Sequence, residues 1–188
     1  MRDEFAQKAF ADVRAPGKAT GNGTTTDCRP PSPLWWVQVR LTTSKGTHPS
    51  SVWLSPRRPS VETTHPTPTD DVGDWYVVDA DRSGFYRVNY DAENWRRLVR
   101  QLSADHSVLA PSMRLRLLDD AFSLGHAGII GYGTAFRLAE YLTSGVDPFI
   151  LRIVRRHLQL IQHLAGADSL ESSLPDAYPI LVRDSSSF

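Results

Sequence analysis

The strongest constraint on the fold is a change in the spacing of apolar residues at Asp91. Before this residue, apolar and polar side chains alternate, which is typical of β-strands with one buried face. After it, apolar side chains recur every three or four residues, which is the spacing of one face of an α-helix. All the strands therefore precede all the helices. This order predicts an α+β fold, in which a partial antiparallel β-sandwich is followed by a superhelix-like domain of helix hairpins.

The chain of 188 residues is long enough for one ordinary domain or two small ones. Residues 1–33 are rich in Gly, Thr and Pro, and we expect an irregular N-terminal segment there. Residues 34–90 are expected to form the portion of the sandwich, and residues 91–188 a truncated helical domain.

Four segments have the composition and alternation of strands, namely residues 34–43, 52–54, 74–80 and 85–90. Residues 44–49 and 63–73 are expected to be loops. The second of the four strands is expected to end at Pro56 and Pro59. Residues 81–84 end in Gly and make a plausible loop for a hairpin between the last two strands.

Four helices are predicted after this point. The Asp91 carboxylate can accept from free backbone N–H groups of the first turn and so cap a helix over residues 92–102. Pro111 suits the first position of a second helix, which runs to about residue 127 and stops at Gly128. A third helix is expected over residues 134–142 and a fourth over residues 148–164, while residues 177–182 are the last candidate element.

Composition excludes several classes of function. Lys+Arg and Asp+Glu both number 21, so the zero net charge gives no electrostatic case for binding nucleic acid. No apolar run approaches the roughly 20 residues of a transmembrane helix, and residues 1–18 lack the apolar core of a signal peptide. Cys28 has no second thiol to pair with, and we interpret it as inert. Asn22 begins a glycosylation sequon, which matters only if the segment is secreted. The compartment stays undecided.

The sequence lacks the usual patterns of catalytic sites. None of its six histidines lies four residues from another, and none is followed by Glu, so we do not expect a zinc site built from this chain alone. Asp119 and Asp120 are adjacent on a predicted helix, so their side chains point about 100° apart. We therefore interpret them as helix charges or as acceptors of a buried hydrogen bond, rather than as an acid/base pair.

The fourth predicted helix is basic and contains no acidic residue. Arg152, Arg155 and Arg156 could receive an acidic group or a peptide carboxylate. The alternative, which we favour, is a solvated face whose charges suit the end of a helix.

The aromatic pairs of the predicted strands also have two interpretations. Trp35-Trp36 and Trp75-Tyr76 could form a platform for a sugar, or they could build the interior of the sandwich. We favour the interior, because large aromatic side chains in alternating strands mostly pack in cores.

Residues 84–91 read Gly-Phe-Tyr-Arg-Val-Asn-Tyr-Asp and follow a Trp-Tyr-Val-Val-Asp segment at 75–79. The two segments resemble a run of the M1 zinc aminopeptidases, the aminopeptidase N group, in which the second reads Gly-Tyr-Tyr-Arg-Val-Asn-Tyr-Asp. The likeness continues at 94–95, 101–102 and 105–106, then at Arg114 and 118–122, and it reaches 127–128 and the region of Leu142. Upstream, 35–39 is similar to the family's Trp-x-(Val/Ile)-Pro strand, with Gln38 in place of the proline. Together the likeness covers roughly residues 34–165.

The resemblance implies the small sandwich and the start of the helical C-terminal domain of such an enzyme. The family binds Zn²⁺ through His-Glu-x-x-His and a later glutamate, and it holds the substrate amine through Gly-x-Met-Glu-Asn. Neither motif occurs here, so no catalytic or metal residue carries over. We expect this chain alone to be inactive. The implied partners are a peptide substrate and the missing catalytic domain, whose active site the helical domain caps.

Three hypotheses remain open at this point: a fragment of a zinc aminopeptidase, a free-standing non-enzymatic module that binds peptides or proteins, and a sugar- or protein-binding sandwich unrelated to proteolysis. An incomplete sandwich and a truncated helical array expose strand edges and apolar surface. We therefore also expect marginal stability for the isolated chain.

Overall fold

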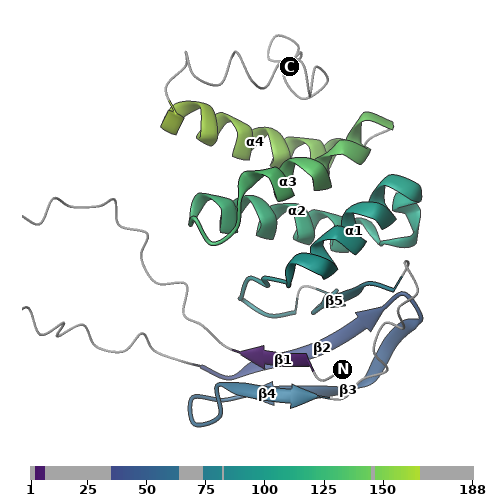
Figure 1. Cartoon of the computed structure of the whole chain (residues 1–188), viewed down its shortest axis with the longest axis vertical. Coiled ribbons are helices and arrows are strands. Elements are labelled where there is room, and N and C mark those ends of the chain that lie inside the picture. Colours follow the sequence, from purple (N-terminus) through teal and green to yellow (C-terminus); the bar gives the residue numbers. More distant parts are fainter. Residues whose placement is uncertain (1–2, 7–34, 64–73, 82, 145–146, 166–188) are drawn as a thin grey trace, which may run out of the picture.

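A computed structural model describes residues 3–6, 35–63, 74–81, 83–144 and 147–165. In this part of the chain, four α-helices are stacked over a layer of antiparallel β-strands (Figure 1). The predicted α+β class is confirmed. Cys28, the sequon at Asn22 and the candidate element at 177–182 lie outside the described residues.

The central strand of the main sheet is β2 (Val37–Thr43), with β3 (Gly46–Leu54) on one side and β5 (Tyr76–Val78) on the other. The predicted alternation is present, because Val37, Val39 and Leu41 are buried while Gln38 and Arg40 between them are not. A separate two-stranded sheet pairs β1 (Asp3–Ala6) with β4 (Ser60–Thr63). The strand β1 lies inside the segment that we predicted to be irregular.

The turn chemistry of this region was partly misjudged. Strand β3 begins at Gly46, well before residue 52, because the Gly46 backbone is in the left-handed region (φ +123°) and allows a tight return onto Thr43. Pro56 sits inside a turn closed by two backbone hydrogen bonds between Ser55 and Arg58, each 3.0 Å long. Pro56 therefore marks a turn within the β layer rather than its end, and the chain resumes as β4 at Ser60.

The predicted strand at 85–90 is wrong. These residues are extended, and Val88 and Tyr90 are buried while Phe85 and Arg87 are exposed, so the predicted alternation exists. However, the segment pairs with no strand of the described residues, and the hairpin expected with β5 does not form.

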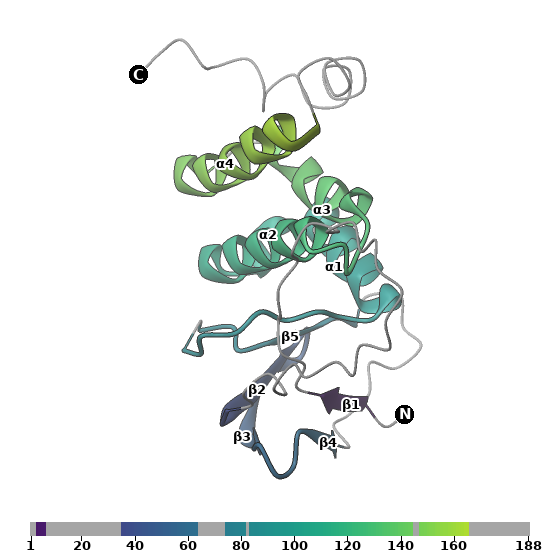
Figure 2. The same cartoon turned by 90° about the vertical axis from the view of Figure 1, so that its left-hand side faces the viewer.

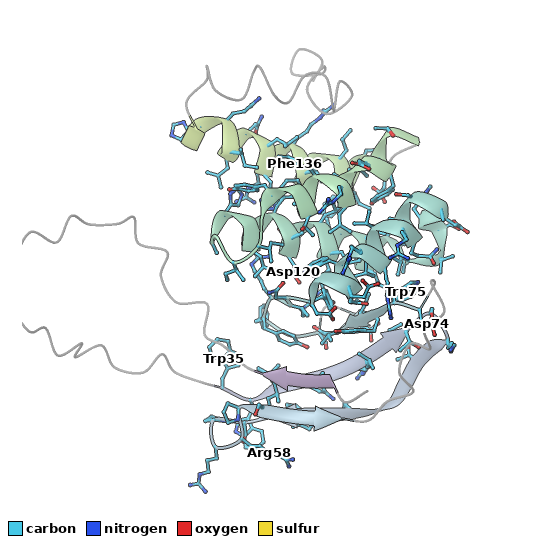
Figure 3. All side chains as sticks on the ribbon, viewed as in Figure 1. Trp35, Arg58, Asp74, Trp75, Asp120 and Phe136 are labelled. Carbon is cyan, nitrogen blue, oxygen red and sulfur yellow. The ribbon has the colours of Figure 1, made fainter. Side chains whose placement is uncertain are left out.

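The aromatic prediction is correct for one pair and wrong for the other. Trp75 is 3% exposed in the core, and Tyr76 packs against it half-buried. Trp35 and Trp36 are 44% and 66% exposed, because they precede the paired part of β2. Figure 3 shows Trp35 at the end of the β layer opposite Asp74 and Trp75. Trp36 packs edge-on against Trp53, with ring centres 6.4 Å apart.

The four helices agree closely with the prediction. They are α1 (Ala92–Ala104), α2 (Pro111–His126), α3 (Tyr132–Ala139) and α4 (Pro148–Ala165), with short 3₁₀ turns at His106–Val108 and Glu140–Ser144. The Asp91 carboxylate caps α1 by accepting from the backbone N–H groups of Glu93 and Asn94, both at 2.9 Å. Gly128 (φ +67°) follows the end of α2 in the left-handed conformation that stops a helix.

One apolar core runs from the sheet into the helices, and Val77, Leu98, Phe122 and Val154 all belong to it. In two perpendicular views α1 and α2 lie nearest the strands, whereas α4 lies farthest from them (Figures 1 and 2). In the described part of the chain, α2 therefore lies between residues 83–90, which follow the sheet, and α4.

Candidate functional site

The turn that follows β5 is closed by a buried carboxylate. Asp79, with a positive φ of 50°, accepts hydrogen bonds from the backbone N–H groups of Ser83 (3.1 Å) and Gly84 (2.9 Å) and from the Ser83 hydroxyl (2.5 Å). Burial opposes its ionisation, but these hydrogen bonds and the nearby Arg116 charge outweigh burial and hold the pKa of Asp79 below its ordinary value. The turn is therefore fixed by an ionised group.

Arg116 of α2 is the partner of that group. Its Nη1 donates to Asp79 Oδ2 at 2.7 Å, and its Nη2 donates to the backbone oxygen of Tyr86 at 2.8 Å. The guanidinium also lies over the Tyr86 ring, 5.1 Å from its centre. Both charged side chains of the pair are at most 5% exposed. A buried ion pair therefore ties the β layer to α2.

Asp120 explains why residues 85–90 are extended without being a strand. Its Oδ2 accepts from the backbone N–H of Val88 at 3.1 Å, and its Oδ1 accepts from Arg87 Nη1 at 3.2 Å. The contact with the Val88 N–H takes the place of a backbone bond that a neighbouring strand would make. Burial raises the pKa of Asp120 to about 6, against the opposing effect of Arg116. Figure 3 shows Asp120 where the helices meet the β layer.

Asp119 shares Arg87 with Asp120 and also contacts α4. Its Oδ2 accepts from Arg87 Nη1 at 2.8 Å, and its Oδ1 lies 3.0 Å from His157 Nε2 of α4. The His157 hydrogen bond, followed by the contacts with Arg87, holds the pKa of Asp119 far below its ordinary value despite partial burial. The interpretation of this acid pair as structural acceptors is therefore confirmed for Asp120, which accepts a buried hydrogen bond.

A chain of hydrogen bonds continues from Asp119 to α3. His157 Nδ1 lies 3.2 Å from His126 Nε2, and His126 Nδ1 lies 2.6 Å from the Tyr132 hydroxyl. The two imidazole centres are 5.4 Å apart, whereas the facing nitrogens are 3.2 Å apart. The difference is roughly the width of one ring, so the rings lie end to end. This head-on arrangement fits a hydrogen bond better than two ligands converging on a metal ion. Across the described residues, no three His, Cys, Asp or Glu side chains could jointly hold a metal.

Two open cavities adjoin this network. One of about 400 Å³ lies between residues 84–87 and the Arg116–Asp120 stretch of α2. The other, of about 600 Å³, lies between α2 and α4 and is lined in part by His126, Ile153, Arg156 and Leu160. Arg87 and Asp119 line both cavities, and we call the second cavity the groove between α2 and α4.

The three arginines predicted as possible peptide contacts do not converge. Arg156 is exposed and lines the larger cavity. Arg152 is exposed and lies over the Phe149 ring, 5.4 Å from its centre. Arg155 is half-buried, and its Nε has no hydrogen-bond partner. The structure thus brings only Arg156 to the groove.

The sequence interpretation missed the cluster around Arg116. A signal was present, because Arg116 lies among Leu115, Leu117 and Leu118 on the apolar side of its helix, four residues before Asp120. A charge in such a position is usually paired. No comparable signal links His126 to His157, which come from different helices.

The family model of the ERAP1-like C-terminal domain matches residues 75–181, a range that contains the whole network from Asp79 to His157. The chain is 34% identical to the human thyrotropin-releasing hormone-degrading ectoenzyme over 117 residues, which is 61% of this chain and 11% of that protein. It is 35% identical to aminopeptidase N of Plutella xylostella over 115 residues (61% and 12%) and 31% identical to human aminopeptidase Q over 148 residues (79% and 14%). The chain thus spans only 11–14% of the length of these relatives. None of the helices in the described ranges is long and apolar enough to cross a membrane.

Proposed function

Because the chain belongs to the ERAP1-like C-terminal domain family, and so to the C-terminal region of M1 aminopeptidases, we propose that it is the non-catalytic part of such an enzyme. In the complete enzyme, a separate catalytic domain would bind Zn²⁺ and remove N-terminal residues from peptides. The present region would cap that active site and help to bind the peptide. It would have no hydrolytic activity alone.

The observation that carries the proposal is the use to which the buried polar groups are put. Asp79, Arg116 and Asp120 are bound to one another or to the 83–88 segment. Asn94 bonds both the N–H and the carbonyl of Tyr76, at 3.0 and 2.9 Å. Each of these groups is engaged in holding the fold together. The sequence also lacks the metal-binding and amine-binding motifs that the resemblance requires for catalysis.

A role in peptide binding rests on the groove between α2 and α4. Its apolar side chains Ile153 and Leu160 lie beside the exposed cation Arg156. We propose Arg156 as the main contact for an acidic group or the carboxylate of a peptide, with Arg152 and Arg155 on the same helix adding positive charge.

Contact with the catalytic domain is proposed for Phe85. Its side chain is fully exposed, at 101%, on the turn fixed by Asp79 and Arg116. Phe85 also lines the cavity of about 400 Å³, so a segment of a partner domain that entered this cavity would contact the ring.

The proposal can be tested by recombination. The pure chain, the separately produced catalytic portion of an aminopeptidase N relative, and their mixture would each be assayed with aminoacyl-arylamide substrates and added zinc. We expect no hydrolysis by the chain alone, and binding and increased activity in the mixture. Phe85→Ser should weaken binding, whereas Phe149→Ser, which alters a half-exposed phenylalanine on α4, should not. Zinc-dependent hydrolysis by the chain alone, or no binding in the mixture, would contradict the proposal.

A further inference from the structure

Helices α2 and α4 are joined by an unusual pair of histidines. His126 is the last residue of α2, and His157 lies in the middle of α4. In the described part of the chain, both side-chain hydrogen bonds between these helices use His157, one to His126 and one to Asp119. The polar attachment of α4 to α2 therefore depends on one imidazole.

The positions of the protons follow from the partners. The ionised Asp119 carboxylate only accepts, so His157 carries its proton on Nε2 and leaves Nδ1 as an acceptor. His126 then donates from Nε2 to His157, and its Nδ1 accepts from the Tyr132 hydroxyl. With both rings neutral, every donor and acceptor in this series of hydrogen bonds has a partner.

Protonation affects this series of hydrogen bonds in two steps. A first added proton can be accommodated, because either ring can then donate to the other and the Tyr132 oxygen can accept instead of donating. A second added proton leaves two N–H groups facing each other across 3.2 Å with no acceptor between them. The direct contact between the rings is then lost.

The surrounding charges favour the neutral pair. The facing groups are Asp119 on α2, Arg87 on the extended segment, Arg156 on α4 and the Tyr132 hydroxyl on α3. Asp119 is the one acid among them, and it is already shared with Arg87. Burial, the neighbouring His157 and Arg87 together lower the pKa of His126. The Phe122 ring, 5.2 Å from His157 and nearly parallel to it, covers the other side.

We infer that His126 and His157 form a pH-sensitive latch, which holds α4 on α2 near neutral pH and releases it when both imidazoles are protonated. Release would widen the groove between the two helices and move Arg156, which lies one residue before His157. This property belongs to the helices themselves and does not depend on the proposed function.

The test compares the full wild-type chain with two matched variants. In His126→Gln, the neutral amide can still donate to His157 and accept from Tyr132, but it takes up no proton. His163→Gln changes an exposed histidine on α4, the helix that contains His157, and serves as the control. Hydrogen exchange of α4 amides would be measured at about pH 7.5 and about pH 5, on either side of the ordinary histidine pKa, and corrected for intrinsic exchange.

We expect the corrected exchange of α4 in the wild type to rise on acidification by up to about thirtyfold at pH 5, the limit set for one imidazole with the ordinary histidine pKa near 6.5 once the latch is open. His163→Gln should behave like the wild type, whereas His126→Gln should keep α4 protected at both pH values. An equal rise in the wild type and His126→Gln would overturn the inference. If His126→Gln does not fold, NMR titration of His126 and His157 in the wild type decides: two separated steps support the latch, and a single joint step refutes it.

Discussion

Replacing Asp79 by Asn isolates the contribution of the buried ion pair. Asn has the same shape as Asp and also tolerates the left-handed backbone conformation that Asp79 adopts at φ 50°. The substitution therefore adds little strain. It removes the negative charge opposite Arg116, only 2.7 Å away, and turns one of the two accepting oxygens into a donor.

The expected loss is large because the charge left behind is buried. Arg116 would keep its hydrogen bond to the Tyr86 carbonyl and its 3.5 Å contact with Asp120, but it would lose its nearer counter-ion at a site where both side chains are at most 5% exposed. Breaking a buried ion pair by removing one partner costs ~3–5 kcal/mol. With a urea dependence of ~1–3 kcal/mol per molar, the midpoint of unfolding should fall by about 2 M.

The assay is urea unfolding of the full chain, followed by circular dichroism and by tryptophan fluorescence. Asp81→Asn is the matched control, because Asp81 is also paired with an arginine, Arg40 at 2.9 Å, but at an exposed site. The free energy of unfolding of this control should change by ~0–1 kcal/mol. The two substitutions are the same chemically and two residues apart, so their difference reports burial.

The pH dependence gives the prediction a second readout. Because the pKa of Asp79 is lowered in the folded state, its contribution is present above the ordinary value of 3.8 and is lost as the pH falls through the folded pKa. The gap between wild type and Asp79→Asn should therefore close in strong acid. A loss below ~1 kcal/mol near neutral pH, equal to that of Asp81→Asn, would refute the reasoning, since the pair would then behave as an exposed one.

Three further perturbations test other parts of the structure. Asp91→Ala should lower the free energy of unfolding by ~0.5–2 kcal/mol in urea melts, because the free N–H groups of Glu93 and Asn94 lose their acceptor. Gly128→Ala should cost ~1–2 kcal/mol in a thermal melt through backbone strain at φ +67°, since no atom lies within 4 Å of the added Cβ. Asp120, with a pKa raised to about 6, binds its proton more tightly folded than unfolded, so it should add stability as the pH falls from about 6 towards 3.8. Urea melts at several pH values should show this gain in the wild type but not in Asp120→Asn.

The helices were predictable because their determinants are local. The Asp91 cap, Pro111 at the start of α2 and Gly128 after its end each act within a few residues. The strand error at 85–90 has the opposite cause. Alternation reports which side chains are buried, and it did so correctly for Val88 and Tyr90, but it does not identify the partner of the backbone. Here the partner is a carboxylate 32 residues later in α2.

In the candidate site, too, some contacts could be predicted from the sequence and others could not. Arg116 and Asp120 are one helical turn apart, so a charged pair on an apolar face could have been inferred from the sequence. The exposure of Trp36 and the meeting of His126 with His157 could not, because each depends on where separate elements are placed. Positions 31 residues apart on different helices have no spacing rule that brings them together.

The different partners of Asp119 and Asp120 imply an order in which the contacts of α2 break as the pH falls. Asp120 faces the buried side, where Arg116 is bound to Asp79, whose pKa is lowered, so that attachment persists until the pH falls below 3.8. Asp119 faces His157, whose side chain is 13% exposed and contacts His126. Two protons on the histidine pair break the contact between His126 and His157, whereas a proton on Asp120 leaves the contact between Asp79 and Arg116 in place. Acidification should therefore separate α4 from α2 while α2 stays fastened to the β layer. Exchange of α1 and α2 amides should stay slow at a pH where that of α4 has already risen.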